Sequence, residues 1–224
     1  MVFKAVLLDL DDTLVDFLKM KKNSVLAAVR AMIKAGLKMS EDEAFEKIFA
    51  IYEKHGWEDQ KAFQRLLHKK SGRVDYKILA HGIIAYRKEK AARLALHDGV
   101  RETLNALKEK KLKLGIVTDA PKLQAYTRLV GLGIEDYFDV VVCFEDTNAH
   151  KPDALPFNKA LSLLGAKAGE VLFVGDWLDR DIIGASKVGM HTAWAKYGDE
   201  KKTPREGARP EFVLESFRDL LKIV

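Results

Sequence analysis

The chain has 224 residues, of which 48% are hydrophobic, enough for one large core or for a core with a small accessory domain. It contains no apolar run of 18 residues and begins without the layout of a signal peptide, so we expect a cytoplasmic protein with no membrane span. The net charge of +5 is unevenly placed, because residues 17–90 carry 17 Lys and Arg against 9 Asp and Glu.

The first predicted element is a strand buried on both faces, because Val6, Leu7 and Leu8 follow one another without polar alternation. Three carboxylates come directly after it, at Asp9, Asp11 and Asp12. Crowded like charges raise one another's pKa, and a divalent cation among them would remove that cost. A single Asp here could equally cap the next helix, so the cluster has to be judged together with the rest of the chain.

Residues 16–94 show helical periodicity and no strand signal, which predicts an inserted all-helical domain with its own small core. The pair Ser40 and Glu43 has the spacing of a capping box, which predicts the start of its second helix. If the positive charge of this insert faces a cleft, Lys19, Lys21 and Lys22 would attract anionic substrates. Otherwise these lysines form a solvated face.

From residue 97 onward helices and strands alternate, with strands predicted at 113–117, 140–144, 171–174 and 192–194. Repeated units of this kind give an α/β fold with a doubly wound parallel sheet and helices on both faces. Residues 197–210 are polar and rich in glycine and proline, which predicts a loop. Residues 212–214 are predicted to add an edge strand, and residues 217–224 a closing helix.

Polar side chains follow the later strands at the places where ligands bind in such sheets. Thr118 and Asp119 follow the second strand, Lys151 comes after the third, and the acidic run from Asp176 through Asp179 to Asp181 follows the fourth. Histidines and acids show no zinc-ligand spacing, and Cys143 alone cannot form an intrachain disulfide.

These four groups resemble, in order and chemistry, the four motifs of the haloacid dehalogenase-like superfamily. The first motif is Asp9-Leu-Asp11-Asp-Thr, and the others contain Thr118, Lys151 followed by Pro152, and Gly175-Asp176. The resemblance implies a Rossmann-like catalytic core formed by residues 1–15 and 95–224. Residues 16–94 are similar in position and length to the family's helical C1 cap.

The resemblance also implies a role for each residue. Asp9 would be the nucleophile that forms an aspartyl-phosphate, and Asp11 the general acid and then the general base. Mg²⁺ would bind to Asp9, the backbone carbonyl of Asp11, and Asp176, since it prefers hard oxygen ligands. Lys151 and Thr118 would hold the phosphoryl group. In the fourth motif Asp181 would orient Lys151 or the metal-bound waters. Asp179 is the alternative residue for this role.

Two positions depart from the common family pattern. Many relatives carry Asn where this chain has Asp119, and a carboxylate beside phosphate is unfavourable. With Pro121 opening a helix, we predict that the Asp119 side chain caps that helix while its backbone N–H faces the phosphate. Asp12 replaces a common glycine, which is a frequent variant.

The sequence thus predicts a Mg²⁺-dependent phosphatase acting on small phosphomonoesters, with a small phosphorylated metabolite as its partner. A phosphomutase and a 2-haloacid dehalogenase of the same superfamily are alternatives. A third is a non-catalytic phosphate-binding or nucleic-acid-binding protein on the same fold, although the chain contains no recognised nucleic-acid-binding motif. Neither the substrate nor the oligomeric state follows from the sequence.

Overall fold

The computed structural model describes residues 3–199 and 207–224, and the chain forms two compact units. One unit consists of Met1–Asp16 with Ala95–Val224, and the other of Phe17–Leu94. We call the first unit the core and the second the insert. Among the described residues, none of the helices is both long and apolar enough to cross a bilayer.

The core contains a six-stranded parallel sheet, which confirms the predicted α/β class. Its strand order is β3-β2-β1-β4-β5-β6. From β1 the strands are added first on one side of the sheet, as β2 and β3, and then on the other, as β4, β5 and β6, so the strand order reverses beside β1. The strands are β1 (Ala5–Leu8), β2 (Lys113–Val117), β3 (Val140–Val142), β4 (Val171–Gly175), β5 (His191–Ala195) and β6 (Phe212–Leu214). The last of these is the predicted edge strand.

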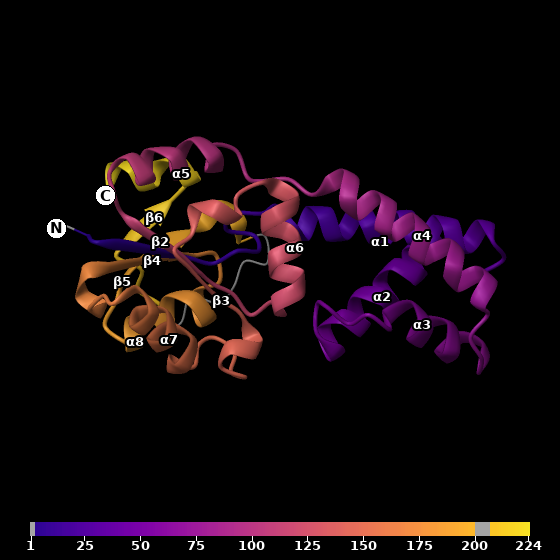
Figure 1. The fold of residues 1–224 in the computed structure, drawn as a ribbon. Helices are drawn as coiled ribbons and strands as arrows, with labels where there is room; N and C mark the ends of the chain where they lie inside the picture. The colour runs from indigo at the N-terminus through magenta and orange to yellow at the C-terminus, as the bar shows by residue number, and fades with distance from the viewer. Residues whose placement is uncertain (1–2, 200–206) are drawn as a thin grey trace. The chain divides into compact units, whose positions relative to one another are not determined.

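Helices cover both faces of this sheet. Figure 1 shows α5 on one side of the strands and α7 with α8 on the other. The core helices are α5 (Val100–Glu109), α6 (Lys122–Leu132), α7 (Ala154–Leu164) and α8 (Ile183–Lys187). Short helical turns join them: η1 (Glu135–Tyr137), η2 (Phe144–Asp146), η3 (Ala168–Glu170), the π-helical η4 (Leu178–Ile182), η5 (Lys196–Gly198) and η6 (Phe217–Lys222). The closing helix is therefore shorter than predicted and of the tighter 3₁₀ type.

Apolar side chains decide how the sheet is covered. All four residues of β1 and all five of β4 are buried, as their unbroken apolar sequences predict. Leu7 and Phe173 share a hydrophobic cluster with Phe157 of α7. Leu8, the last residue of β1, pairs with Ile116 on one side and Val174 on the other. The residues that follow these three strands are thereby held at one edge of the sheet.

The insert consists of four helices around its own hydrophobic cluster. They are α1 (Phe17–Lys34), α2 (Glu41–His55), α3 (Ala62–Ser71) and α4 (Tyr76–Arg93). Ser40 caps α2 by accepting a hydrogen bond from the Glu43 amide, as its spacing predicts. The third helix begins at Ala62, and the Asp59 side chain accepts the Lys61 amide and holds a turn before it.

Both expectations for the insert lysines required exposed charges, and Lys21 meets neither of them. Its side chain is buried on α1, and its ammonium group donates a hydrogen bond of 2.6 Å to the Trp57 carbonyl. The same group lies 3.9 Å from the centre of the Tyr52 ring, a cation–π contact. Lys19 and Lys22 are exposed. In the predicted polar loop, residues 200–206 lie outside the described residues.

Candidate active site

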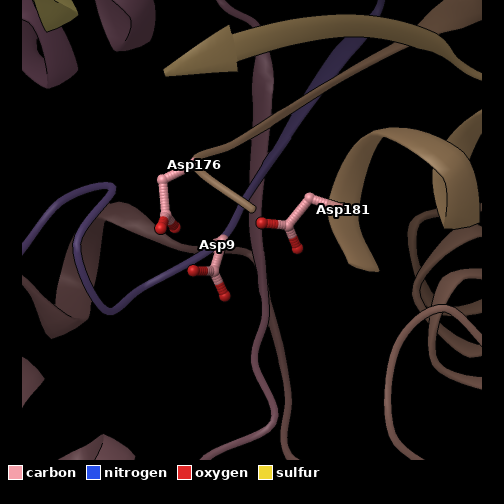
Figure 2. Close-up of side chains that lie close together, drawn as sticks. All are labelled: Asp9, Asp176 and Asp181. Atoms are coloured by element: carbon pink, nitrogen blue, oxygen red, sulfur yellow. The ribbon is translucent and has the colours of Figure 1, made fainter. Parts of the chain in front are cut away.

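Three carboxylates converge at the carboxyl edge of the sheet (Figure 2). Asp9 follows β1, Asp176 follows β4, and Asp181 lies in η4. Each offers one oxygen within 4.8 Å of the others, and their exposed fractions are 7%, 8% and 1%. Gly175 makes this possible, since a Cβ atom there would lie 2.4 Å from the Asp181 carboxyl group. The cluster contains three of the sequence-predicted site residues.

Lys151 supplies the positive charge in this cluster. Its buried ammonium nitrogen lies 2.5 Å from Asp9 Oδ1 and 2.6 Å from Asp181 Oδ1, and donates to the Val117 carbonyl. Burial alone would lower the pKa of Lys151, but the charges of Asp181 and Asp9 outweigh it and raise the pKa. We therefore treat Lys151 as permanently charged.

One ammonium group does not balance three buried carboxylates. Burial raises the pKa of Asp9 despite the opposing effect of Lys151. The pKa of Asp176 is raised well above its usual range by burial and by the charges of Asp181 and Asp9. Burial is also the main cause that raises the pKa of Asp181 to about 7. The site is short of positive charge, as expected where a cation binds.

The turn after β1 carries Asp11, Asp12 and Thr13. Asp12 has a φ of 64°, in the left-handed region that Asp tolerates better than most residues, and its amide donates to the Val15 carbonyl. The Thr13 hydroxyl donates to Asp176 Oδ1 at 3.2 Å. Gly198 packs on the turn so closely that a Cβ atom would lie 1.8 Å from the Asp12 carbonyl oxygen. The turn is thus fixed from two sides.

Asp119 does not cap the following helix, so that prediction is wrong. Helix α6 begins after Pro121 without a side-chain cap, and the Lys122 amide donates to Glu145 instead. The Asp119 carboxylate accepts the Lys151 amide at 2.9 Å and the Arg180 guanidinium at 3.1 Å. Because Arg180 supplies a full positive charge, it is a stronger partner than a helix amide.

Thr118 is buried after β2, and its hydroxyl oxygen accepts the Ala120 amide at 3.1 Å. That bond uses an acceptor position and leaves the hydroxyl proton to be donated. Asp179 has an intermediate exposure and is not part of the carboxylate cluster, whereas Asp181 is. Asp9, Thr118 and Asp176 directly follow three adjacent parallel strands, whereas Lys151 and Asp181 come from the segments after β3 and β4.

Comparisons with known proteins identify the family. Residues 6–195 match the family model described as haloacid dehalogenase-like hydrolase. This chain belongs to that family. It is 35% identical to a glyceraldehyde 3-phosphate phosphatase of Methanopyrus kandleri, with 100% of this chain and 97% of the relative covered, and 34% identical to that of Pyrococcus abyssi, with 100% and 94% covered. A solved phosphatase of the same family from Thermococcus onnurineus is 29% identical, with a TM-score of 0.68 and 99% and 97% covered.

This haloacid dehalogenase-like hydrolase is thus a phosphatase, acting on small phosphorylated compounds. Four relatives that are 32–35% identical to this chain, each matched over 92–97% of its own length, are named glyceraldehyde 3-phosphate phosphatases. They give no support to the phosphomutase, the dehalogenase or the non-catalytic alternative. Phosphatases of this family generally use Mg²⁺, and the donor set of Asp9 and Asp176 fits it, because both offer hard carboxylate oxygens in a site short of positive charge.

Sequence reasoning missed three side chains beside the site of this hydrolase. Arg128 of α6 forms an ion pair with Asp11, Arg180 binds Asp119, and the Tyr197 hydroxyl donates to the Thr13 carbonyl. Arg128 left a signal in the sequence, because it occupies an apolar position of α6 between the buried residues Ala125 and Leu129. For Arg180 and Tyr197 the partner lies 61 and 184 residues away in the chain, and no local pattern predicts such contacts.

Proposed function

We propose that this chain is a cytoplasmic, Mg²⁺-dependent phosphatase that hydrolyses small phosphomonoesters through an aspartyl-phosphate on Asp9. The observation that carries the proposal is the buried contact of 2.5 Å between Lys151 and Asp9, next to Asp176 and Asp181. This contact supports the proposal, because a carboxylate beside a fixed cation could attack a phosphoryl group whose charge that cation neutralises.

In the first half-reaction an Asp9 oxygen would attack phosphorus while the bond from phosphorus to the ester oxygen breaks. Asp11 would give its proton to the departing alkoxide, so that an alcohol leaves. Lys151 and the Thr118 hydroxyl would hold the phosphoryl oxygens, together with the Asp119 backbone N–H. Asp9, Asp176 and the Asp11 carbonyl would hold Mg²⁺, which supplies further positive charge to the transferring group.

In the second half-reaction Asp11 would take a proton from water, whose oxygen attacks phosphorus. The bond between phosphorus and Asp9 then breaks, releasing inorganic phosphate and restoring the carboxylate. Asp181 would keep Lys151 in place during both steps, since it forms the second ion pair of that ammonium group. No group outside the chain, the cation and water is needed to balance the protons.

The names of the relatives support a narrower substrate class as a proposal. The proteins from Methanopyrus kandleri and Pyrococcus abyssi are named glyceraldehyde 3-phosphate phosphatases and match nearly the full length of this chain. We propose that this chain likewise acts on short phosphorylated aldehydes and alcohols. The basic character of residues 17–90 would favour the approach of anionic substrates.

A panel of phosphorylated metabolites, assayed for phosphate release with and without Mg²⁺, tests the proposal. We expect three-carbon phosphates to give the highest kcat/KM, and chelation of divalent cations to remove activity. Asp9→Asn serves as the matched control, because it keeps the size of the side chain and removes the nucleophilic charge. Phosphate release by Asp9→Asn at the rate of the unaltered protein would contradict the proposal.

A further inference from the structure

Arg128 is a charged residue at an apolar position of helix α6. It lies on α6 between Ala125 and Leu129, both fully buried, and its own side chain is 2% exposed. An arginine cannot lose its proton inside a protein, so its charge is buried with it. Removing such a charge from water is unfavourable unless good partners compensate it, which is why arginine is rarely placed in this way.

A carboxylate partner of this arginine is Asp11. Arg128 Nη1 lies 3.1 Å from Asp11 Oδ2, and the two residues come from different elements of the core. The backbone on either side of Asp11 is already fixed by β1 and by the bond from the Asp12 amide to the Val15 carbonyl. The Asp11 side chain is 22% exposed, so it can still rotate about its side-chain torsion angles. The ion pair with Arg128 restricts that freedom.

We propose that Arg128 is a positioning residue that holds the Asp11 carboxyl group in the orientation needed for proton transfer. The inference rests on the proposed function, in which Asp11 protonates the leaving alkoxide and later deprotonates water. Proton transfer requires the carboxyl oxygen within hydrogen-bond reach of the ester oxygen, and a misplaced carboxyl group loses that reach. Arg128 acts only through Asp11, and its planar fork of donors suits it to fix a carboxylate.

This role predicts a defect that depends on the leaving group. General acid–base catalysis contributes about 10² to 10⁴-fold, so loss of orientation should cost Arg128→Met about 10 to 10²-fold in kcat for an alkyl phosphate such as glycerol phosphate. Nitrophenyl phosphate, whose leaving group needs little protonation, should lose clearly less. KM should stay within about 2-fold, because Asp11 does not bind the substrate in the ground state. Arg128→Lys, which keeps the charge but not the planar fork, should fall between the two proteins.

A double-mutant cycle separates this role from a purely structural one. Arg128→Met is made in the native chain and in Asp11→Asn, and kcat for glycerol phosphate is measured at high enzyme concentration. If Arg128 acts through Asp11, its removal from the Asp11→Asn protein causes no further loss. Arg101→Met is the matched control, because Arg101 donates to the Leu132 and Gly133 carbonyls at the end of the same helix. It should leave the ratio of alkyl to aryl turnover unchanged.

The outcomes are distinct. Equal losses for both esters, or a full loss added to that of Asp11→Asn, would show that Arg128 only supports the fold and would overturn the inference. Arg128→Lys decides the question if thermal unfolding shows that Arg128→Met is not folded. If the native protein hydrolyses neither ester in Mg²⁺, the proposed function itself fails. If the native protein is active but the double-mutant cycle is additive, the role of Arg128 is refuted and the proposed function still stands.

Discussion

The core site and the insert use similar ion pairs in opposite surroundings. The nitrogen and oxygen atoms of Lys151 and Asp9 lie 2.5 Å apart, as do those of Lys47 and Glu43 on α2. The first pair has side chains 3% and 9% exposed, and the second 45% and 42%. Exposed pairs contribute about 0–1 kcal/mol to stability, whereas breaking a buried pair costs about 3–5 kcal/mol. The same contact therefore contributes differently to stability in the two regions.

The insert keeps most of its positive charge in water. A pocket of about 770 Å³ between α2 and α3 has seven exposed basic side chains on its lining: Lys47, Lys54, His55, Lys61, Arg65, His68 and Lys69. In the core, charged groups are removed from water and forced together around Lys151. The comparison indicates that the core gives up stability to create a reactive site, while the insert charges cost its fold little.

The largest effect is expected at Lys151. Lys151→Met leaves the buried carboxylates of Asp9 and Asp181 without their cation, and should lower the free energy of unfolding by about 3–5 kcal/mol. It should also reduce kcat by about 10² to 10³-fold, as loss of a preorganised charge does in other enzymes. Lys47→Met is the control, with a change below about 1 kcal/mol. Urea unfolding measures the stability of both variants, and steady-state kinetics measures their kcat. Equal losses of stability in Lys151→Met and Lys47→Met would contradict the comparison.

A second effect separates activity from stability. Asp176→Asn should abolish hydrolysis at ordinary Mg²⁺ concentrations, because it removes a proposed metal ligand. In chelator it should stabilise the protein, since it removes one of the repelling buried carboxylates. A gain of about 1 kcal/mol would raise Tm by about 2–4 °C in a chain of this size. Calorimetry in chelator provides the measurement, and a lower Tm would show that the carboxylates are already balanced without a cation.

The pH dependence follows from the same crowding. The pKa of Asp181 is raised from 3.8 to about 7, so the folded protein retains a proton that the unfolded chain releases. The folded state then binds more protons, and stability without divalent cations should fall as pH rises from about 4 to 7. Asp181→Asn should reduce this slope, and the raised pKa values of Asp9 and Asp176 account for the slope that remains. Denaturant titrations across that range check the sign, and stability rising with pH in chelator would refute it.

A last comparison lies within the insert. Lys21 is buried there, with its bond to the Trp57 carbonyl and its contact with Tyr52, so Lys21→Met should cost about 1–3 kcal/mol by removing both interactions. Lys19→Met and Lys22→Met alter exposed groups on the same helix and should change stability by less than about 0.5 kcal/mol. Equal effects of the three substitutions on urea unfolding would refute the distinction.

The sequence allowed the sheet and the places of the site residues to be predicted, because both depend on local patterns. Unbroken apolar runs indicate buried strands, and polar residues directly after them must meet at one edge of a parallel sheet. The partners of Asp119, Lys21 and Arg128 could not be predicted in this way. Each depends on how distant side chains compete for the same group, and such competition is decided only when the chain is packed.

The phosphoryl group on Asp9 is the central claim, and its direct measurement is a rapid acid quench during turnover of a labelled phosphomonoester in Mg²⁺, followed by peptide mapping. We expect label on the peptide that contains Asp9, and no label in Asp9→Asn. Asp11→Asn should retain more label with an aryl phosphate, because water activation is slowed. Turnover without any labelled peptide in either the native protein or Asp11→Asn, or label on another residue, would contradict the account.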